Sequence, residues 1–169
     1  MLTSYYVSFN NLVEQYWLPL ANAAYHLTGD RDSVNDIVQN TFIDAYKEIE
    51  QLAEPSETRT KLYTILRNKA LDYLNKQSNN QKSKKLFIPI AAENAQAIVS
   101  EIFVDQMFKL AKEDREVLAG LYFLELSHHD LAAAIGINEN AVKARATHAK
   151  EMLGEVLSGH SSKIPAKHK

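Results

Sequence analysis

The stretch SHHDLAAAIGINENAVKARATHAK, residues 127–150, decides the fold because it carries the start and end signals of two short helices. Ser127 and Asp130 fit a capping box, in which the serine hydroxyl accepts a hydrogen bond from an amide one turn on. Gly136 follows an apolar run and suits the left-handed backbone that closes a helix. Asn138 is a good cap for a second helix. The pattern predicts a helix-turn-helix.

The second helix of this pair is expected to enter at an angle fixed by Ile137 packing on Val142, a hydrophobic staple. Its other side is rich in side chains that hydrogen-bond base edges and phosphates, as in helices that lie in the major groove of DNA. The residues assigned to this DNA-reading face are Ser127, Asn138, Glu139, Asn140, Lys143, Arg145 and Thr147. A solvated helical hairpin with no DNA partner has the same local pattern, so the rest of the chain must separate the two interpretations.

Apolar residues at helical spacing also fill the chain ahead of this pair, so the expected fold is all-α. Helices are expected over residues 12–27, 33–52, 58–76, 98–110 and 113–123. The residues 28–30, Thr-Gly-Asp, break the first run, and Asp32 or Ser33 is expected to cap the second helix. Trp17 and Phe42 stand at core spacing, which predicts that they pack in the interior.

A polar segment without sustained periodicity separates the two groups of helices and is interpreted as a linker. The expected organisation is two small helical domains joined by this linker, the second being the helix-turn-helix domain. The boundaries are a first domain at 1–77, a linker at 78–97, a second domain at 98–157 and a tail at 158–169.

Charge is distributed unevenly along a chain whose net charge is only -2. Residues 1–52 hold seven acidic and two basic residues, and residues 53–86 hold eight basic and three acidic residues, so the two blocks carry -5 and +5. The local field matters more for the choice of partner than the sum over the chain. An acidic block next to a basic block therefore suggests two different partners.

Several classes of protein are excluded by what the sequence lacks. Zero cysteines exclude disulfides, thiolate metal sites and a cysteine nucleophile, and no GxGxxG or HExxH motif is present. His128 and His129 are neighbours on a helix and would point about 100° apart, so they do not form a metal site. No catalytic residue, metal or cofactor is expected. With no signal peptide and no apolar run of about 20 residues, the chain is expected to be cytoplasmic without membrane insertion.

Three segments resemble the extracytoplasmic-function (ECF) class of bacterial RNA polymerase sigma factors, and the resemblance covers nearly the whole chain. LTGDRD at 27–32, running into DIVQNTF at 36–42, is similar to the family's core-polymerase-binding segment. LYTILRNKALDYL at 62–74 resembles the segment that reads and opens the minus-ten promoter element. EDREVL at 113–118, together with the helix-turn-helix, resembles the domain that reads the minus-thirty-five element.

The resemblance implies an alternative sigma factor that binds core RNA polymerase and promoter DNA and is restrained by an anti-sigma factor. The residues implied to bind core polymerase are Asp36, Gln39, Asn40 and Asp44. The residues implied to contact the minus-ten element are Arg59, Lys61, Thr64, Arg67, Asn68, Lys69 and Asp72. The DNA-reading face of the helix-turn-helix would contact the minus-thirty-five element. Promoter opening requires flipped bases to be held, and Asn68 lies where the family holds one.

The chain departs from the family's pattern at Lys61, where a tryptophan is usual, at Thr64, often an arginine, and in the loop at 52–54. The departures at Lys61 and in the loop imply altered melting residues. The second helix of the pair also departs from the family, which is commonly richer in arginine where this chain has Ala146, Thr147, His148 and Glu151. This implies weak, salt-sensitive DNA binding by the chain alone, with tethering to polymerase supplying the rest.

Two alternatives stay open. One is a sigma-like decoy for an anti-sigma protein that has lost promoter opening. The other is a free-standing helix-turn-helix regulator whose acidic first domain serves dimerisation or ligand binding.

Overall fold

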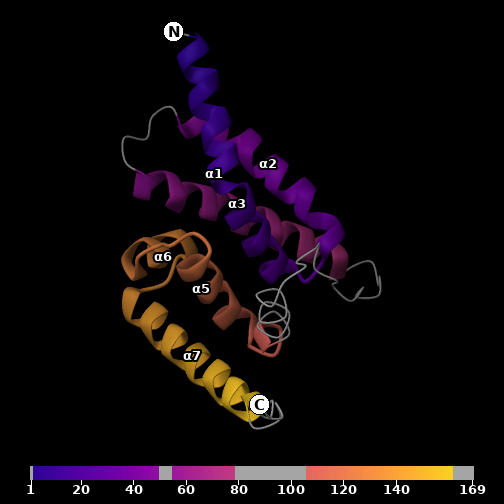
Figure 1. Ribbon diagram of the computed structural model, residues 1–169, viewed down its shortest axis with the longest axis vertical. Helices are drawn as coiled ribbons and strands as arrows, with labels where there is room; N and C mark the ends of the chain where they lie inside the picture. The colour runs from indigo at the N-terminus through magenta and orange to yellow at the C-terminus, as the bar shows by residue number, and fades with distance from the viewer. Residues whose placement is uncertain (1, 50–54, 79–105, 162–169) are drawn as a thin grey trace, which may run out of the picture.

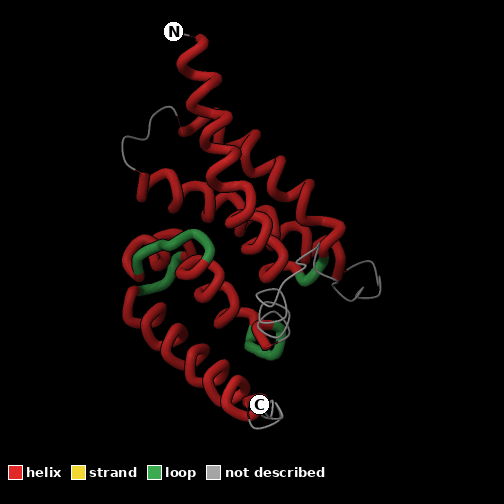
Figure 2. Tube along the Cα trace, in the orientation of Figure 1, coloured by secondary structure: helices red, strands yellow, loops and turns green. Residues whose placement is uncertain are grey.

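The computed structural model describes residues 2–49, 55–78 and 106–161, and the side chains of residues 9–48, 55–78 and 106–154. Every regular element in these ranges is a helix, which confirms the all-α prediction (Figures 1 and 2). The helices are α1 (Leu2–Thr28), α2 (Arg31–Ile49), α3 (Pro55–Ser78), α5 (Lys112–Tyr122), α6 (His128–Ile135) and α7 (Glu139–Ser161). In the described part of the chain, no helix combines the length and the apolar character that crossing a membrane requires.

The turn between α1 and α2 is built by the residues that the sequence marks as helix breakers. Gly29 has a φ of 68° and its amide bonds to the carbonyl of Tyr25 at 2.7 Å, closing α1. Asp30, not Asp32 or Ser33, caps α2, because its Oδ1 accepts a hydrogen bond of 2.9 Å from the amide of Asp32. The expected cap was therefore wrong by two or three residues, and α2 begins at Arg31.

Helices α1, α2 and α3 pack into a bundle whose interior follows the predicted apolar stripes. The rings of Trp17 and Phe42 stack with centroids 6.2 Å apart and an interplanar angle of 7°, as expected for core residues. The buried side chains of this bundle are Tyr16, Leu20, Ala23, Ala24, Leu27, Ile37, Val38, Phe42, Ala45, Leu62, Leu66 and Ala70. This interior leaves one side of α2 and one side of α3 facing solvent.

The helix-turn-helix forms as predicted. The hydroxyl of Ser127 accepts a 3.0 Å hydrogen bond from the amide of Asp130, and Gly136 has φ 73° and ψ 32°, the left-handed closure of α6. Asn138 Oδ1 accepts a 2.8 Å hydrogen bond from the amide of Ala141, which caps α7. Helix α7 continues to Ser161, beyond the expected start of the tail at 158, and runs through Gly154 and Gly159.

The helix expected over 98–110 is described only at its end. Residues 98–105 lie outside the described residues, 106 and 107 are helical, and 108–110 form a turn and a bend. The guanidinium of Arg115 donates to the carbonyls of Phe108 and Leu110 at 3.4 and 3.3 Å, so these carbonyls are satisfied by a side chain rather than by a continuing helix. Helix α5 then starts at Lys112, close to its predicted position.

The two halves of the chain share one hydrophobic core. Helix α5 lies against α1 and α6 lies against α3, as Figure 1 shows. The buried cluster that begins in α1 to α3 continues through Val117, Ala119, Leu131 and Val142 of the second half. Of the predicted linker, Ser78 belongs to the end of α3, and residues 79–97 lie outside the described residues. The predicted domains are therefore docked on each other in this structure.

Candidate nucleic-acid interface

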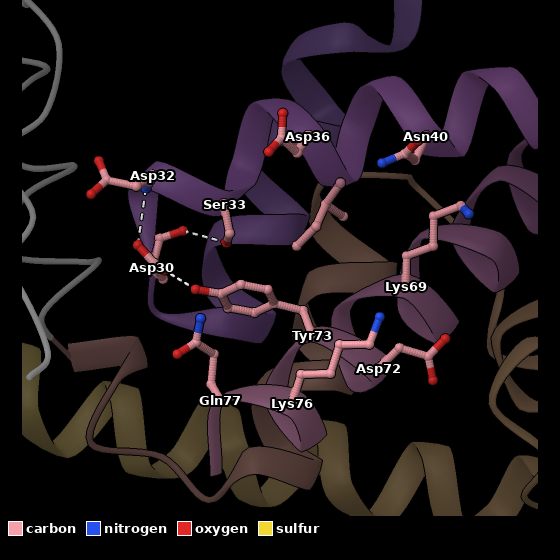
Figure 3. Close-up of a pocket in the computed structure, with 11 residues that line it drawn as sticks. Asp30, Asp32, Ser33, Asp36, Asn40, Lys69, Asp72, Tyr73, Lys76 and Gln77 are labelled. Carbon is pink, nitrogen blue, oxygen red and sulfur yellow. Dashed lines mark hydrogen bonds between the residues drawn. The ribbon is translucent and has the colours of Figure 1, made fainter. Parts of the chain in front are cut away.

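The polar residues of α2 that the sequence assigns to a protein partner are all exposed. Asp36, Gln39, Asn40 and Asp44 project from the side of α2 that turns away from the bundle interior. Asp36 and Asn40 also line an open groove of about 520 Å³ between α2 and the second half of α3, shown in Figure 3. Exposed acids on a helix are available to a basic partner.

The groove in Figure 3 is closed at one end by a contact between α3 and the turn before α2. The hydroxyl of Tyr73 donates to the carboxylate of Asp30, and the hydroxyl of Ser33 donates to the carbonyl of Asp30 at 2.8 Å. Lys69 and Lys76 line the α3 side. The groove therefore has acidic residues on its α2 wall and two lysines together with Asp72 on its α3 wall.

Three basic side chains of α3, Lys61, Arg67 and Lys69, are paired with acids. Lys69 Nζ lies 2.6 Å from Asp44 Oδ2, and Lys61 pairs with Glu48. The hydrogen bond from Lys69 lowers the pKa of Asp44 below its ordinary value. Along their shared border the acidic and basic blocks therefore neutralise each other.

A second hollow, of about 410 Å³, lies between the end of α2 and the middle of α3 and is lined in part by Asn68. Asn68 and Asp72 lie one helical turn apart, and both are exposed at its edge. The hydroxyl of Thr64 donates back to the carbonyl of Thr60 at 2.8 Å, so its hydrogen is engaged. Arg59 is half-buried, and its Nε has no hydrogen-bond partner among the described residues. Asn68 is exposed, and its contact with a DNA base stays a prediction.

The predicted DNA-reading face of the helix-turn-helix is divided between structural and exposed side chains. Ser127 and Asn138 use their side-chain oxygens to cap helices. Asn140, Lys143 and Thr147 are exposed along the first turns of α7.

Two other residues of that face are less available to DNA. Glu139 pairs with Lys143 at 2.8 Å, which lowers the pKa of Glu139, and lies 3.6 Å from His129. Arg145 is half-buried. Asn140 can therefore meet base edges without losing a cap or an intrahelical contact. Lys143 becomes available once it leaves Glu139, and the hydroxyl of Thr147 once it leaves the carbonyl of Lys143, to which it donates at 2.9 Å.

One contact between the halves reaches the predicted minus-ten residues. Arg67 of α3 pairs with the carboxylate of Glu116 in α5, and the two side chains are 22% and 11% exposed. The hydroxyl of Tyr63 donates to the carbonyl of the same Glu116 at 2.6 Å. Tyr63 is fully buried, and this burial raises its pKa well above the ordinary value. Glu116 and Tyr63 were not predicted as functional, since sequence patterns do not reveal contacts across the linker.

An aromatic cluster forms a second interdomain contact. His26 of α1 stacks on Phe108, with centroids 5.8 Å apart, and lies 4.8 Å from the ring of Phe123. Its Nδ1 lies 2.7 Å from the carbonyl of Asn22, and its Nε2 has no partner among the described residues. Burial lowers the pKa of His26, so the imidazole is held neutral. Within the described ranges, no cluster of three or more potential metal ligands occurs.

Two family models match this chain and together span most of it. Residues 12–80 match the sigma-70 region 2 model, and residues 100–153 match the sigma-70 region 4 model. The first match contains the α2–α3 grooves, and the second contains the helix-turn-helix.

Curated proteins of the same kind are similar over most of their length. The chain is 26% identical over 149 residues to the ECF RNA polymerase sigma factor SigL of Mycobacterium tuberculosis, covering 84% of each chain. It is 28% identical over 163 residues to the ECF RNA polymerase sigma-E factor of Haemophilus influenzae, covering 86% of this chain and 85% of that protein.

Solved structures share the fold. The sigma factor RpoE in complex with the anti-sigma factor NepR, from Bartonella quintana, superposes with a TM-score of 0.76 at 23% identity, covering 89% of this chain and 97% of that chain. CnrH in complex with the cytosolic domain of CnrY superposes with a TM-score of 0.63 at 24% identity, covering 89% and 88%.

Proposed function

The chain belongs to the sigma-70 family of RNA polymerase sigma factors, in its extracytoplasmic-function class, and from that premise we propose how its exposed residues divide the work. It is an alternative sigma factor whose partners are core RNA polymerase and promoter DNA. We assign polymerase binding to α2, the minus-ten element to α3 and the minus-thirty-five element to α7. The observation that carries this division is that the three faces are distinct and each keeps exposed polar side chains.

The polymerase-binding face is assigned to Asp36, Gln39 and Asn40. All three are exposed and lie on the side of α2 away from the bundle core, where a partner can reach them without unfolding the domain. Asp44 was predicted to belong to this face, but its carboxylate is paired with Lys69. Its contribution to polymerase binding therefore depends on the release of that lysine.

Promoter DNA is assigned to two surfaces. On α3, Asn68 and Asp72 are exposed, while Arg67 and Lys69 are paired with acids and have to exchange those partners for phosphates. On α7, Asn140 and Lys143 would contact the upstream element. The helix-turn-helix places these side chains one turn apart on a capped helix, which suits insertion in the major groove.

We also propose that an anti-sigma factor restrains this protein, as the similar sigma factor RpoE was solved in complex with the anti-sigma factor NepR. We propose that the sigma factor itself acts in the cytoplasm, performs no bond chemistry and needs no cofactor. Its role is to position polymerase.

The first test is run-off transcription from fragmented host genomic DNA by core RNA polymerase, with and without this protein. New start sites that share two upstream elements would support a working sigma factor. Tight core binding without transcripts would favour the decoy, and absence of core binding would favour a free-standing regulator.

Single substitutions test the division of labour. Asp36→Ala and Gln39→Ala should lower affinity for core polymerase, whereas Glu14→Ala, which removes an exposed acid from α1, should not. Lys143→Ala should reduce use of the upstream element and leave core binding unchanged, with Lys112→Ala as a charge-matched control in the same half. Equal effects of a variant and its control would contradict the assignment.

A further inference from the structure

The interface between the two halves contains an acid placed directly on a predicted DNA-binding arginine. Arg67 is one of the minus-ten residues, and its guanidinium is paired with Glu116 of α5. Both side chains are largely withdrawn from solvent, at 22% and 11% exposure. The guanidinium is not screened by bulk water as an exposed pair would be. Arg67 therefore cannot meet a phosphate unless Glu116 leaves.

Glu116 is held on α3 at two points, not one. Its carboxylate pairs with Arg67 and its carbonyl accepts the hydrogen bond of Tyr63, one helical turn earlier on α3. Gly120, one turn further along α5, makes room for the Tyr63 ring: a Cβ there would lie 3.2 Å from Tyr63 Cε1. The pair is thus fixed by backbone as well as side-chain contacts, which distinguishes it from a chance surface ion pair.

Carboxylate and phosphate use the same donor geometry on a guanidinium. A planar carboxylate and a tetrahedral phosphate each present a pair of anionic oxygens that can accept from the arginine fork. A carboxylate placed at Arg67 therefore occupies the position that a DNA phosphate would take. The exposed residues of α7 are not covered by the other half of the molecule. The α7 surface can therefore meet DNA while the halves are docked, whereas Arg67 cannot.

We propose that Glu116 is an internal competitor for DNA: it holds the two halves closed and blocks the Arg67 region of α3 until the halves separate. This inference rests on the proposed assignment of α3 to the minus-ten element. In the closed state the chain presents its helix-turn-helix but not Arg67. Separation solvates Tyr63, Glu116 and Arg67 together, so none of these polar groups is left buried without a partner. Binding events that favour the separated state are then coupled to exposure of Arg67.

The test uses the intact chain with one fluorophore on each half. Because the chain has no cysteine, Asn35→Cys in α2 and Ala133→Cys in α6, both at exposed positions, give a defined labelling pair. Energy transfer between the labels reports separation. Fluorescence anisotropy of a DNA duplex of arbitrary sequence reports phosphate binding, which does not depend on base identity.

Two variants distinguish the effect of separating the two halves from the effect of changing the net charge. Glu116→Gln should lower energy transfer and tighten DNA binding by about threefold or more, because apparent affinity scales with the binding-competent fraction. The salt dependence should steepen by about 0.9 in the log-log slope, the value for one added phosphate contact. Tyr63→Phe removes the hydrogen bond to the carbonyl of Glu116 without changing the net charge. It should therefore also lower energy transfer and tighten DNA binding. Arg67→Ala in the Glu116→Gln background should cancel the gain in affinity.

The matched control is Glu48→Gln, which changes the net charge equally and releases Lys61, but lies within the first half. It should leave energy transfer unchanged. Equal affinity gains in Glu48→Gln and Glu116→Gln without separation would overturn the inference, since charge alone would then explain the result. Separation without a gain in DNA affinity would also overturn it, while run-off transcription by the wild-type chain tests the proposed function independently.

Discussion

Replacing Gly136 by alanine should destabilise the protein, and the same replacement at Gly154 should stabilise it. Gly136 has φ 73° and ψ 32°, a conformation that costs a residue with a Cβ about 1–2 kcal/mol. A Cβ at Gly136 would meet nothing within 4 Å, so no steric clash adds to this cost. Restriction of the unfolded chain offsets about 0.4–1 kcal/mol. The net loss should therefore be roughly 1 kcal/mol.

Gly154 provides a control of opposite sign in the same half of the molecule. It lies inside α7, and a Cβ there would also meet nothing within 4 Å. Because glycine in a helix interior is destabilising by roughly 0.5–1 kcal/mol relative to alanine, Gly154→Ala should raise stability by that amount. Both variants add the same methyl group, but Gly136 has a left-handed backbone and Gly154 lies inside a helix.

Differential scanning calorimetry or urea unfolding measures both changes. For a chain of this size, 1 kcal/mol corresponds to a shift in Tm of about 2–4 °C. Gly136→Ala should lower Tm by about that much, and Gly154→Ala should raise it slightly less. Gly136→Asn should lose less than Gly136→Ala, since asparagine tolerates the left-handed region. A Gly136→Ala protein as stable as wild type would refute the left-handed closure of α6.

Three further predictions concern caps and titrating groups. Asn138→Ala should cost about 1 kcal/mol in urea unfolding, because α7 loses its capping oxygen. Lys69→Met should return the lowered pKa of Asp44 to its ordinary range, which NMR titration of the carboxyl carbon would detect; an unchanged midpoint would argue against the pair. Burial lowers the pKa of His26, so the unfolded chain binds more protons below about pH 6.5 and stability should fall as pH drops. His26→Phe should make Tm less sensitive to pH between 7 and 5.

Local signals in the sequence were sufficient for the helix-turn-helix. Ser127, Gly136 and Asn138 act through their own backbone neighbours, so their roles can be predicted without knowledge of the rest of the fold. The periodic stripes of α1 to α3 were predictable for the same reason. The cap of α2 was misplaced because Asp30 and Asp32 are equally good caps, and tertiary packing of Tyr73 on Asp30 favours the first.

The sequence could not show which charges meet. Net charge along the chain predicted an acidic and a basic block, but the pairing of Lys69 with Asp44 depends on how α2 and α3 cross. The contact between Arg67 and Glu116 joins residues 49 positions apart in different halves. Such contacts arise from docking of whole helices, for which a single sequence carries no local signal.

The continuous core has a consequence for anyone who divides this protein into fragments. A piece ending at residue 78 would present the ring of Tyr63, fully buried in the whole chain, to water, together with the partners of Phe108 on α1. A piece starting at residue 106 would expose the matching surface of α5 and α6. Both fragments would then carry exposed apolar patches and be prone to self-association. Soluble halves would need polar replacements at these contacts, chosen so that the helices themselves are preserved.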